Sequence, residues 1–95
     1  MILTMDKVKV GVVGVGHLGS IHARIYKEIQ NCSLSGVCDI DKNRLAEISD
    51  KLDVPGYSDY RQLFGKVDAV SIAVPTKSHY QVAQEFLKNK IHCLV

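Results

Sequence analysis

The feature that most constrains this chain is the glycine cluster Gly14-Val-Gly16-His17-Leu18-Gly19, because it falls where a strand pattern changes into a helix pattern. The β-branched run Val8–Val13 precedes it and predicts a buried strand. After it, a helical period begins and ends near Asn31, a turn-forming residue. The buried face of this predicted helix consists of Leu18, Ile21, His22, Ile25 and Ile29.

The spacing of the three glycines gives each a steric role. Gly14 permits a tight turn, Gly16 lets a pyrophosphate approach the backbone where a Cβ would intrude, and Gly19 lets the helix pack close to the strand. The first turn of that helix offers unpaired N–H groups and about half a positive charge to phosphate groups. His17 and Leu18 lie within the loop, and we include both among the candidate cofactor-binding residues.

An acidic residue stands where such a fold places its ribose ligand. Asp39 lies 20 residues after Gly19, at the end of the next predicted strand, where a carboxylate accepts hydrogen bonds from the adenosine ribose hydroxyls. A 2′-phosphate would meet like charge at Asp39, so we expect NAD to be preferred over NADP, a preference that Lys42 and Arg44 soften. Asp39 could instead cap the following helix, but Asp41 is better placed to do so.

The rest of the chain continues to alternate strands and helices. Further strands are predicted over 34–39, 54–57, 67–74 and 91–95. The predicted helix caps are Asp41, Ser58 and Thr76, and the predicted buried helix faces are Leu45, Ile48 and Leu52, then His79, Val82, Ala83 and Phe86. This order predicts a single α/β domain over residues 1–95, a Rossmann-type parallel sheet with right-handed crossovers and helices on both faces.

Composition narrows the classes of partner. The net charge of +2 comes from scattered Lys and Arg residues without a basic stripe, which argues against nucleic acid, and no apolar run approaches the roughly 20 residues that span a bilayer. Residues 1–7 lack the features of a secretory signal. The chain has three cysteines, Cys32, Cys38 and Cys93, an odd number without the spacing of metal ligands. We therefore expect a reduced, cytoplasmic protein without a metal site.

Two other nucleotide-binding classes fit the pattern less well. An FAD-binding Rossmann domain usually carries Glu where this chain has Asp39. A methyltransferase loop binds no pyrophosphate and therefore does not need this glycine spacing before a helix.

Three segments together resemble the glucose–fructose oxidoreductase / inositol dehydrogenase (Gfo/Idh/MocA) family over nearly the whole chain. They are residues 11–24 with the glycine cluster, residues 37–41 around Asp39, and residues 69–80. The resemblance implies that the backbone of Val74, Pro75 and Thr76 lines the nicotinamide half of the cofactor, with His79 near that wall. His79 could equally form a local hydrogen bond in the first turn of its helix.

The resemblance also implies the reaction, a hydride exchange between NAD(P) and a hydroxyl of a sugar, cyclitol or nucleotide sugar. The Val-Pro-Thr segment favours a UDP-N-acetylhexosamine. The family's important Lys follows the strand matching 91–95 in a Glu-Lys-Pro segment, and a substrate domain comes after it. We therefore expect a fragment of an NAD-dependent dehydrogenase, truncated after the fifth strand and without catalytic residues of its own. The alternative is a non-catalytic NAD(H)-binding or sensing module.

The last predicted strand bears on association. It is nearly all apolar, and the helix that should cover it is expected beyond Val95. Uncovered strands of this kind pair with other chains, so we expect self-association or a homo-oligomer.

Overall fold

The computed structural model describes residues 7–94. The segment Met1–Asp6, predicted to lack a secretory signal, lies outside the described residues, as does Val95, the expected end of the last strand. The elements are β1 (Val8–Val13), α1 (His17–Glu28), β2 (Cys32–Cys38), α2 (Lys42–Leu52), β3 (Gly56–Tyr57), the 3-10 helix η1 (Tyr60–Leu63), β4 (Ala69–Ile72), α3 (Thr76–Lys88) and β5 (His92–Leu94). β4 is shorter than the strand predicted over 67–74, but Val67 and Val74, which lie outside it, still pack on the core.

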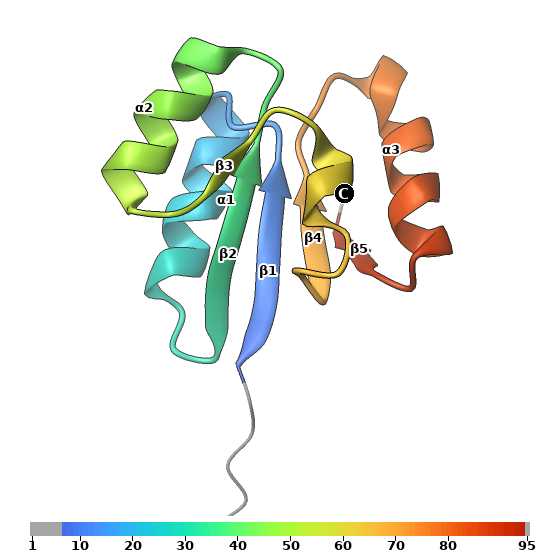
Figure 1. Ribbon diagram of the computed structural model, residues 1–95, viewed down its shortest axis with the longest axis horizontal. Helices are drawn as coiled ribbons and strands as arrows, with labels where there is room; N and C mark the ends of the chain where they lie inside the picture. Colours follow the sequence, from blue (N-terminus) through green and yellow to red (C-terminus); the bar gives the residue numbers. More distant parts are fainter. Residues whose placement is uncertain (1–6, 95) are drawn as a thin grey trace, which may run out of the picture.

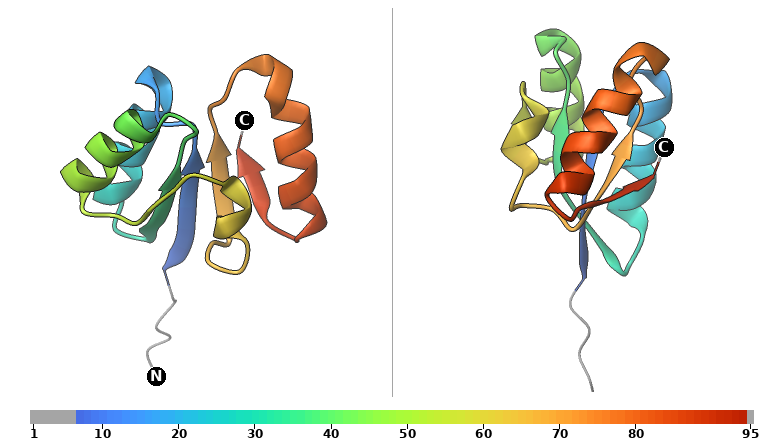
Figure 2. Two further views of the ribbon diagram at one scale, coloured as in Figure 1. Left: turned by 45° about the horizontal axis from the view of Figure 1, so that its top comes forward. Right: turned by 90° about the vertical axis from the view of Figure 1, so that its right-hand side faces the viewer.

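The strands form one parallel sheet in the order β3-β2-β1-β4-β5 (Figure 1). The chain moves outward from β1 in one direction through β2 and β3, then returns to the other side of β1 through β4 and β5. Figure 2 shows α1 and η1 on opposite sides of this sheet. The predicted Rossmann-type fold is confirmed, and the order reverses between β1 and β4, where folds of this kind bind ligands.

Each face of the sheet carries its own hydrophobic cluster. Val12 and Val13 point to opposite faces because successive strand residues alternate. On the α1 and α2 side the buried members are Val12, Val15, Ala23, Val37, Leu45, Ile48 and Val54. On the η1 and α3 side they are Val13, Cys38, Leu63, Val67, Val70, Ile72, Val82, Phe86 and Ile91. The predicted inner faces of α2 and α3 are thus confirmed at their central positions.

The predicted inner face of α1 is only partly correct, because Ile21 and His22 are half-buried but the other three predicted members are exposed. Gly19 and Ala23 are its buried residues, whereas Leu18, Ile25 and Ile29 are 59%, 45% and 41% exposed. Gly19 and Ala23 stand four residues apart on one face of the helix, and their small side chains let the helix axis approach the strands closely. That close approach turns the larger apolar side chains outward.

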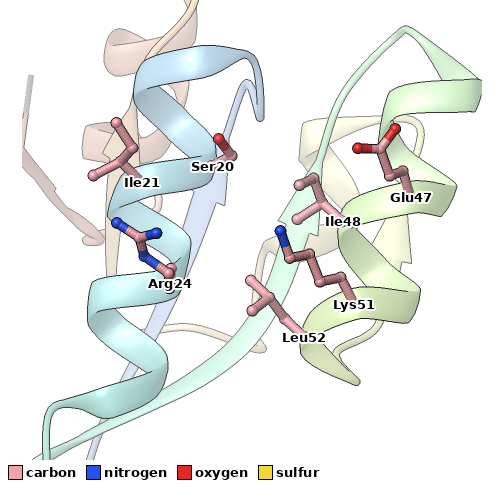
Figure 3. Close-up of a pocket in the computed structure, with 7 residues that line it drawn as sticks. All are labelled: Ser20, Ile21, Arg24, Glu47, Ile48, Lys51 and Leu52. Carbon is pink, nitrogen blue, oxygen red and sulfur yellow. The ribbon is translucent and has the colours of Figure 1, made fainter.

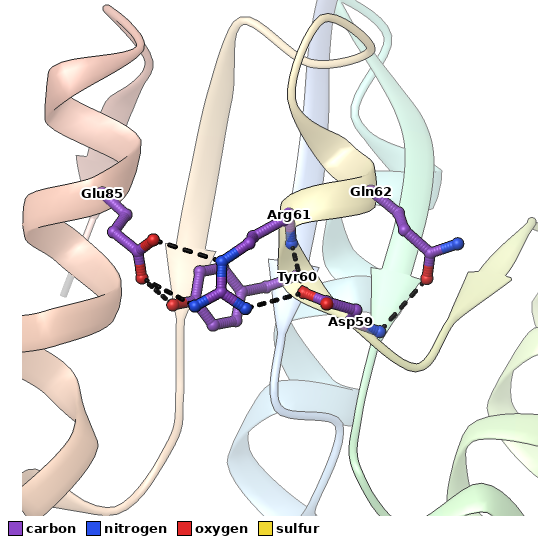
Figure 4. Close-up of polar contacts among 5 residues, drawn as sticks. All are labelled: Asp59, Tyr60, Arg61, Gln62 and Glu85. Carbon is purple, nitrogen blue, oxygen red and sulfur yellow. Dashed lines mark hydrogen bonds and ion pairs between the residues drawn. The ribbon is translucent and has the colours of Figure 1, made fainter.

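The structure confirms one of the three predicted helix caps. Asp41 caps α2 as predicted, because its carboxylate accepts hydrogen bonds from two backbone N–H groups. Ser58 does not cap η1. Asp59 does so instead, and Gln62 Oε1 in turn accepts from the Asp59 backbone N–H at 3.2 Å (Figure 4). This reciprocal capping box uses Asp and Gln at the spacing such boxes require.

Thr76 is likewise not a cap. It is the first helical residue of α3, and Pro75 precedes it as the cap residue with φ −54° and ψ 146°. No side chain within the described chain caps this helix; the Pro75 carbonyl accepts from the Ser78 N–H at 2.9 Å. Proline fixes φ near this value, so the turn into the helix is set one residue earlier than the hydroxyl suggested.

Candidate dinucleotide site

The glycine cluster forms the turn from β1 into α1. Gly14 has φ +91°, and a Cβ there would lie 2.5 Å from the Ala73 carbonyl oxygen. A Cβ on Gly19 would lie 1.6 Å from the Gly14 carbonyl oxygen. Both positions therefore require glycine, one for its left-handed backbone and both for space, as the sequence predicted.

Gly16 differs from its two neighbours in the motif. It is the N-cap residue of α1, and a Cβ there would meet only Arg44 Nη1, at 3.2 Å. No side chain within residues 7–94 caps this helix, and its first turn holds no acidic residue. The backbone at Gly16 thus lies open beside a helix terminus that carries partial positive charge.

Asp39 follows β2 directly, and its carboxylate bridges two backbone segments. Oδ2 accepts from the Val15 N–H in the glycine turn at 2.9 Å, and Oδ1 accepts from the Asp41 N–H at 2.8 Å. An ionised carboxylate offers about four acceptor sites, so both oxygens retain capacity for further donors. The carboxylate is held against the glycine turn, at the tip of the neighbouring strand.

These features surround one crevice of about 460 Å³ at the carboxyl ends of the strands. Its volume falls within the range of small-molecule sites. Five predicted site residues line it: Gly14, Gly16, Asp39, Val74 and Pro75. The other five do not appear in its lining: His17, Leu18, Gly19, Thr76 and His79. Gly19 is buried behind the turn, and His17, Leu18 and Thr76 are exposed.

Sequence reasoning missed the far wall of the crevice. Tyr60 of η1 and Ser78 of α3 line it, together with Ser58 and Val82. The Tyr60 hydroxyl donates to the Glu85 carboxylate on α3 (Figure 4). The Tyr60 ring packs against two phenylalanine rings, those of Phe64 and Phe86. No local motif marks Tyr60, because only the packing of η1 against α3 brings it to the crevice.

Burial controls the ionisation of one thiol at the crevice. Cys38 is 3% exposed at the end of β2. Burial, and secondarily the negative charges of Asp39 and Asp59, raise the pKa of Cys38 from 9.0 to about 12. Burial also raises the pKa of Cys93. The Cys38 thiol is therefore protonated at neutral pH and behaves as a small apolar side chain.

A smaller hollow of about 160 Å³ lies between α1 and α2 and contains none of the predicted site residues (Figure 3). Its lining combines charged and apolar side chains: Ser20, Ile21, Arg24, Glu47, Ile48, Lys51 and Leu52. Within residues 7–94, no helix is long and apolar enough to cross a membrane.

Known proteins resemble this chain closely. It is 40% identical over 91 residues to the UDP-N-acetylglucosamine 3-dehydrogenase of Acidithiobacillus ferrooxidans, a match covering 96% of this chain and 28% of that protein. A solved structure of that enzyme aligns with a TM-score of 0.87 over 95% of this chain and 29% of the other. The myo-inositol 2-dehydrogenase of Thermotoga maritima is 34% identical over 88% of this chain and 26% of its own length.

A third relative carries a ligand. The scyllo-inositol dehydrogenase of Lactobacillus casei, solved with bound NAD(H) and scyllo-inositol, aligns with a TM-score of 0.85 at 28% identity. That alignment covers 93% of this chain and 27% of the other. The chain thus spans little more than a quarter of the length of these relatives.

A match to a family model confirms the resemblance suggested by the three sequence segments. The family described as "Oxidoreductase family, NAD-binding Rossmann fold" matches residues 8–95. This range contains the glycine turn, Asp39 and the segment after β4. The predictions of the family and of NAD as its cofactor are confirmed, and the chain belongs to this oxidoreductase family of Gfo/Idh/MocA type as an NAD-binding Rossmann domain.

Proposed function

We propose that this chain binds NAD in the crevice at the strand ends and orients it for hydride transfer in a dehydrogenase. One juxtaposition carries the proposal: an open backbone at Gly16, the uncapped start of α1 and the Asp39 carboxylate all border one crevice. A pyrophosphate needs the first two, and a ribose diol needs the third. Bound NAD supplies the hydride acceptor, while the chain supplies binding and orientation.

In this proposal each side of the crevice holds one part of the cofactor. The pyrophosphate lies against Gly16 and the first-turn N–H groups of α1, beside His17 and Leu18. The ribose hydroxyls donate to the free acceptor sites of Asp39. Val74 and Pro75 border the same crevice. They form the wall toward the nicotinamide half, and Thr76 and His79 in the first turn of α3 are assigned to the same wall.

Arg44 bears on the choice between NAD and NADP. It lines the crevice, its guanidinium lies over Gly16, and no ion pair within residues 7–94 engages it. We infer that it faces the phosphates of the cofactor and offsets part of the repulsion that Asp39 exerts on a 2′-phosphate. Arg44→Gln should then weaken NADP more than NAD, which competitive calorimetry of the two cofactors measures.

Calorimetric titration of this chain with NAD tests the binding proposal. Asp39→Asn replaces one carboxylate oxygen by an amide that cannot accept, and should weaken NAD binding by about 1–3 kcal/mol. Asp50→Asn, an exposed change on α2, is the matched control and should leave affinity unchanged. Failure of the unsubstituted chain to bind NAD, or equal binding by Asp39→Asn, contradicts the proposal.

The reaction belongs to a longer protein, since the chain spans about 28% of the length of its relatives. We propose that a second domain supplies the substrate pocket and that a Lys after β5 serves the chemistry. UDP-N-acetylglucosamine is the favoured substrate, because the relative with 40% identity is named for it. Reduction of NAD by that longer protein, followed by absorbance with this substrate and with myo-inositol, tests the proposal. Binding of NAD without turnover of either would support the sensing module instead.

We also propose a reducing, cytoplasmic location and self-association of this chain. Three free cysteines within the described chain support the first. The second rests on β5, an edge strand of the described sheet whose Leu94 is 56% exposed.

A further inference from the structure

One polar contact of the central sheet takes no part in the site described above. Within residues 7–94, Ser71 on β4 is the one polar side chain that is fully buried, with 0% exposure. Its Oγ shares a hydrogen bond of 2.7 Å with Nδ1 of His22 on α1. A buried hydroxyl requires such a partner, and the pair joins elements 49 residues apart in the sequence.

The pair stands directly behind the glycine turn. His22 follows Gly19 by three residues, so the two lie on one side of α1 a turn apart. Ala73 follows β4 directly, and Ser71 precedes it by two residues, so the alternation of the extended chain puts both side chains on the same side of the sheet. A Cβ on Gly19 would lie 3.4 Å from the Ala73 Cβ, which shows that the first turn of α1 touches the end of β4.

Ala73 ties that strand end to the turn itself. Its N–H donates to the Val13 carbonyl at 2.8 Å, and its carbonyl oxygen stands against the α-carbon of Gly14. The contacts of α1 with this part of the sheet therefore lie at two levels: its first turn approaches Ala73, directly after β4, and its second turn holds the hydrogen bond from His22 to Ser71. Small residues set how closely α1 can approach the sheet, but only the hydrogen bond has a preferred direction, so it constrains the rotation of α1 against β4.

We propose that His22 and Ser71 form a positioning pair that holds the amino-terminal turn of α1 in the rotation required by the cofactor pyrophosphate. The inference rests on the proposed NAD binding and deepens it, since it identifies what orients the N–H groups of that turn. Neither side chain touches the cofactor. Their contribution is preorganisation: without the bond, the turn must be ordered when the phosphates bind, which weakens affinity.

Calorimetric titration with NAD, using this chain, tests the proposal through two serine changes. Ser71→Ala removes the hydrogen bond and should raise the Kd for NAD about three- to tenfold. Ser49→Ala is the matched control, because Ser49 also donates its hydroxyl proton to a partner, the Val54 carbonyl, at the far end of α2. It should change the Kd less than twofold.

The two ends of the bond should behave as one unit. His22→Ala should match Ser71→Ala, and the double variant should bind no more weakly than either. His22→Asn places an amide near the position of Nδ1 and should recover most of the affinity. Amide hydrogen exchange supplies a readout without ligand: the Ser20 N–H, which donates to the Gly16 carbonyl at 2.9 Å, should exchange faster in Ser71→Ala and His22→Ala, and at the normal rate in Ser49→Ala.

The outcomes separate the two proposals. If the unsubstituted chain binds no NAD, the proposed function fails and this inference with it. If it binds and Ser71→Ala binds equally well, only the positioning role is wrong. Unfolding of Ser71→Ala under the titration conditions, or an equal loss of affinity in Ser49→Ala, assigns the pair to general stability and overturns the inference.

Discussion

The substitution Gly16→Ala should affect NAD binding without affecting the folding of the glycine turn, so it separates these two roles of the turn. Gly14 and Gly19 cannot separate them, because a Cβ at either position would lie within 2.5 Å of backbone oxygen. At Gly16 the added Cβ meets only the end of the Arg44 side chain, at 3.2 Å, and that side chain can move. Its φ of −66° is also one that alanine readily adopts.

The free energy of unfolding should therefore change little. Alanine is a poorer N-cap residue than glycine, which costs a few tenths of a kcal/mol up to about 1 kcal/mol. Against this, alanine restricts the unfolded chain and contributes about 0.4–1 kcal/mol of stability. The two effects oppose each other, so the net change should stay within about 0.5 kcal/mol.

The free energy of NAD binding should change much more. If the pyrophosphate rests on the Gly16 backbone, a methyl group there displaces it from the N–H groups of α1. Loss of one charge-assisted hydrogen bond costs about 1.5–3 kcal/mol, which corresponds to a Kd roughly 10- to 150-fold higher.

Urea unfolding and calorimetry with NAD, run on the same preparations, measure both quantities. Gly65→Ala gives the reverse pattern and serves as the control: Gly65 has φ +80° with open space around it, so alanine there is strained but remote from the crevice. It should lower stability by about 1–2 kcal/mol and leave the Kd unchanged. A Gly16→Ala chain that is fully stable and binds NAD normally would show that no phosphate approaches this backbone.

Three further predictions concern other parts of the molecule. Gly19→Ala should reduce stability by about 3 kcal/mol or more in urea unfolding, because its Cβ would stand 1.6 Å from a carbonyl oxygen and α1 must shift; a smaller loss would indicate that α1 relaxes easily. The raised pKa of Cys38 means that its stabilising contribution is complete below pH 9.0 and declines as the pH rises toward about 12. At pH ~10.5 the unsubstituted chain should have lost about 2 kcal/mol more than Cys38→Ala, relative to pH 8, and equal losses would refute the shift. Leu94→Lys should reduce self-association in light scattering, because Lys blunts a strand edge, whereas Leu87→Lys, equally exposed on α3, should not.

The parts of the site that sequence reasoning found are those fixed by local sterics. Gly14 and Gly19 must be glycine because nearby backbone oxygens, in the turn or at the adjoining strand end, leave no room for a Cβ. The spacing of the glycines alone therefore predicts the turn. Asp39 was found because a parallel strand must deliver its last residue to the same edge of the sheet. Gly14 and Asp39 line one crevice, whereas Gly19 is buried behind the turn.

The parts that it missed depend on packing between distant segments. Tyr60 reaches the crevice only because η1 packs on α3, 25 residues further along the chain at Glu85. The sequence alone does not distinguish Asp59 from the neighbouring Ser58 as the cap of η1, because Ser and Asp are equally good N-cap residues in isolation. The reciprocal hydrogen bond with Gln62 decides between them, and a search for the capping-box spacing would have found it.

The partly incorrect prediction for the buried face of α1 and the correct prediction of the glycine turn have one physical cause. Periodicity assigns the largest apolar side chains to the interior, yet a helix that must bring its first turn within contact of Gly14 can present only small residues to the sheet. Gly19 and Ala23 satisfy that requirement, so Leu18 and Ile25 are turned outward. His22 lies beside this narrow face and makes a hydrogen bond there instead of an apolar contact. The glycine spacing requires α1 to lie close to the sheet. This requirement, and not the hydrophobic period of the helix, therefore decides which residues of α1 are buried.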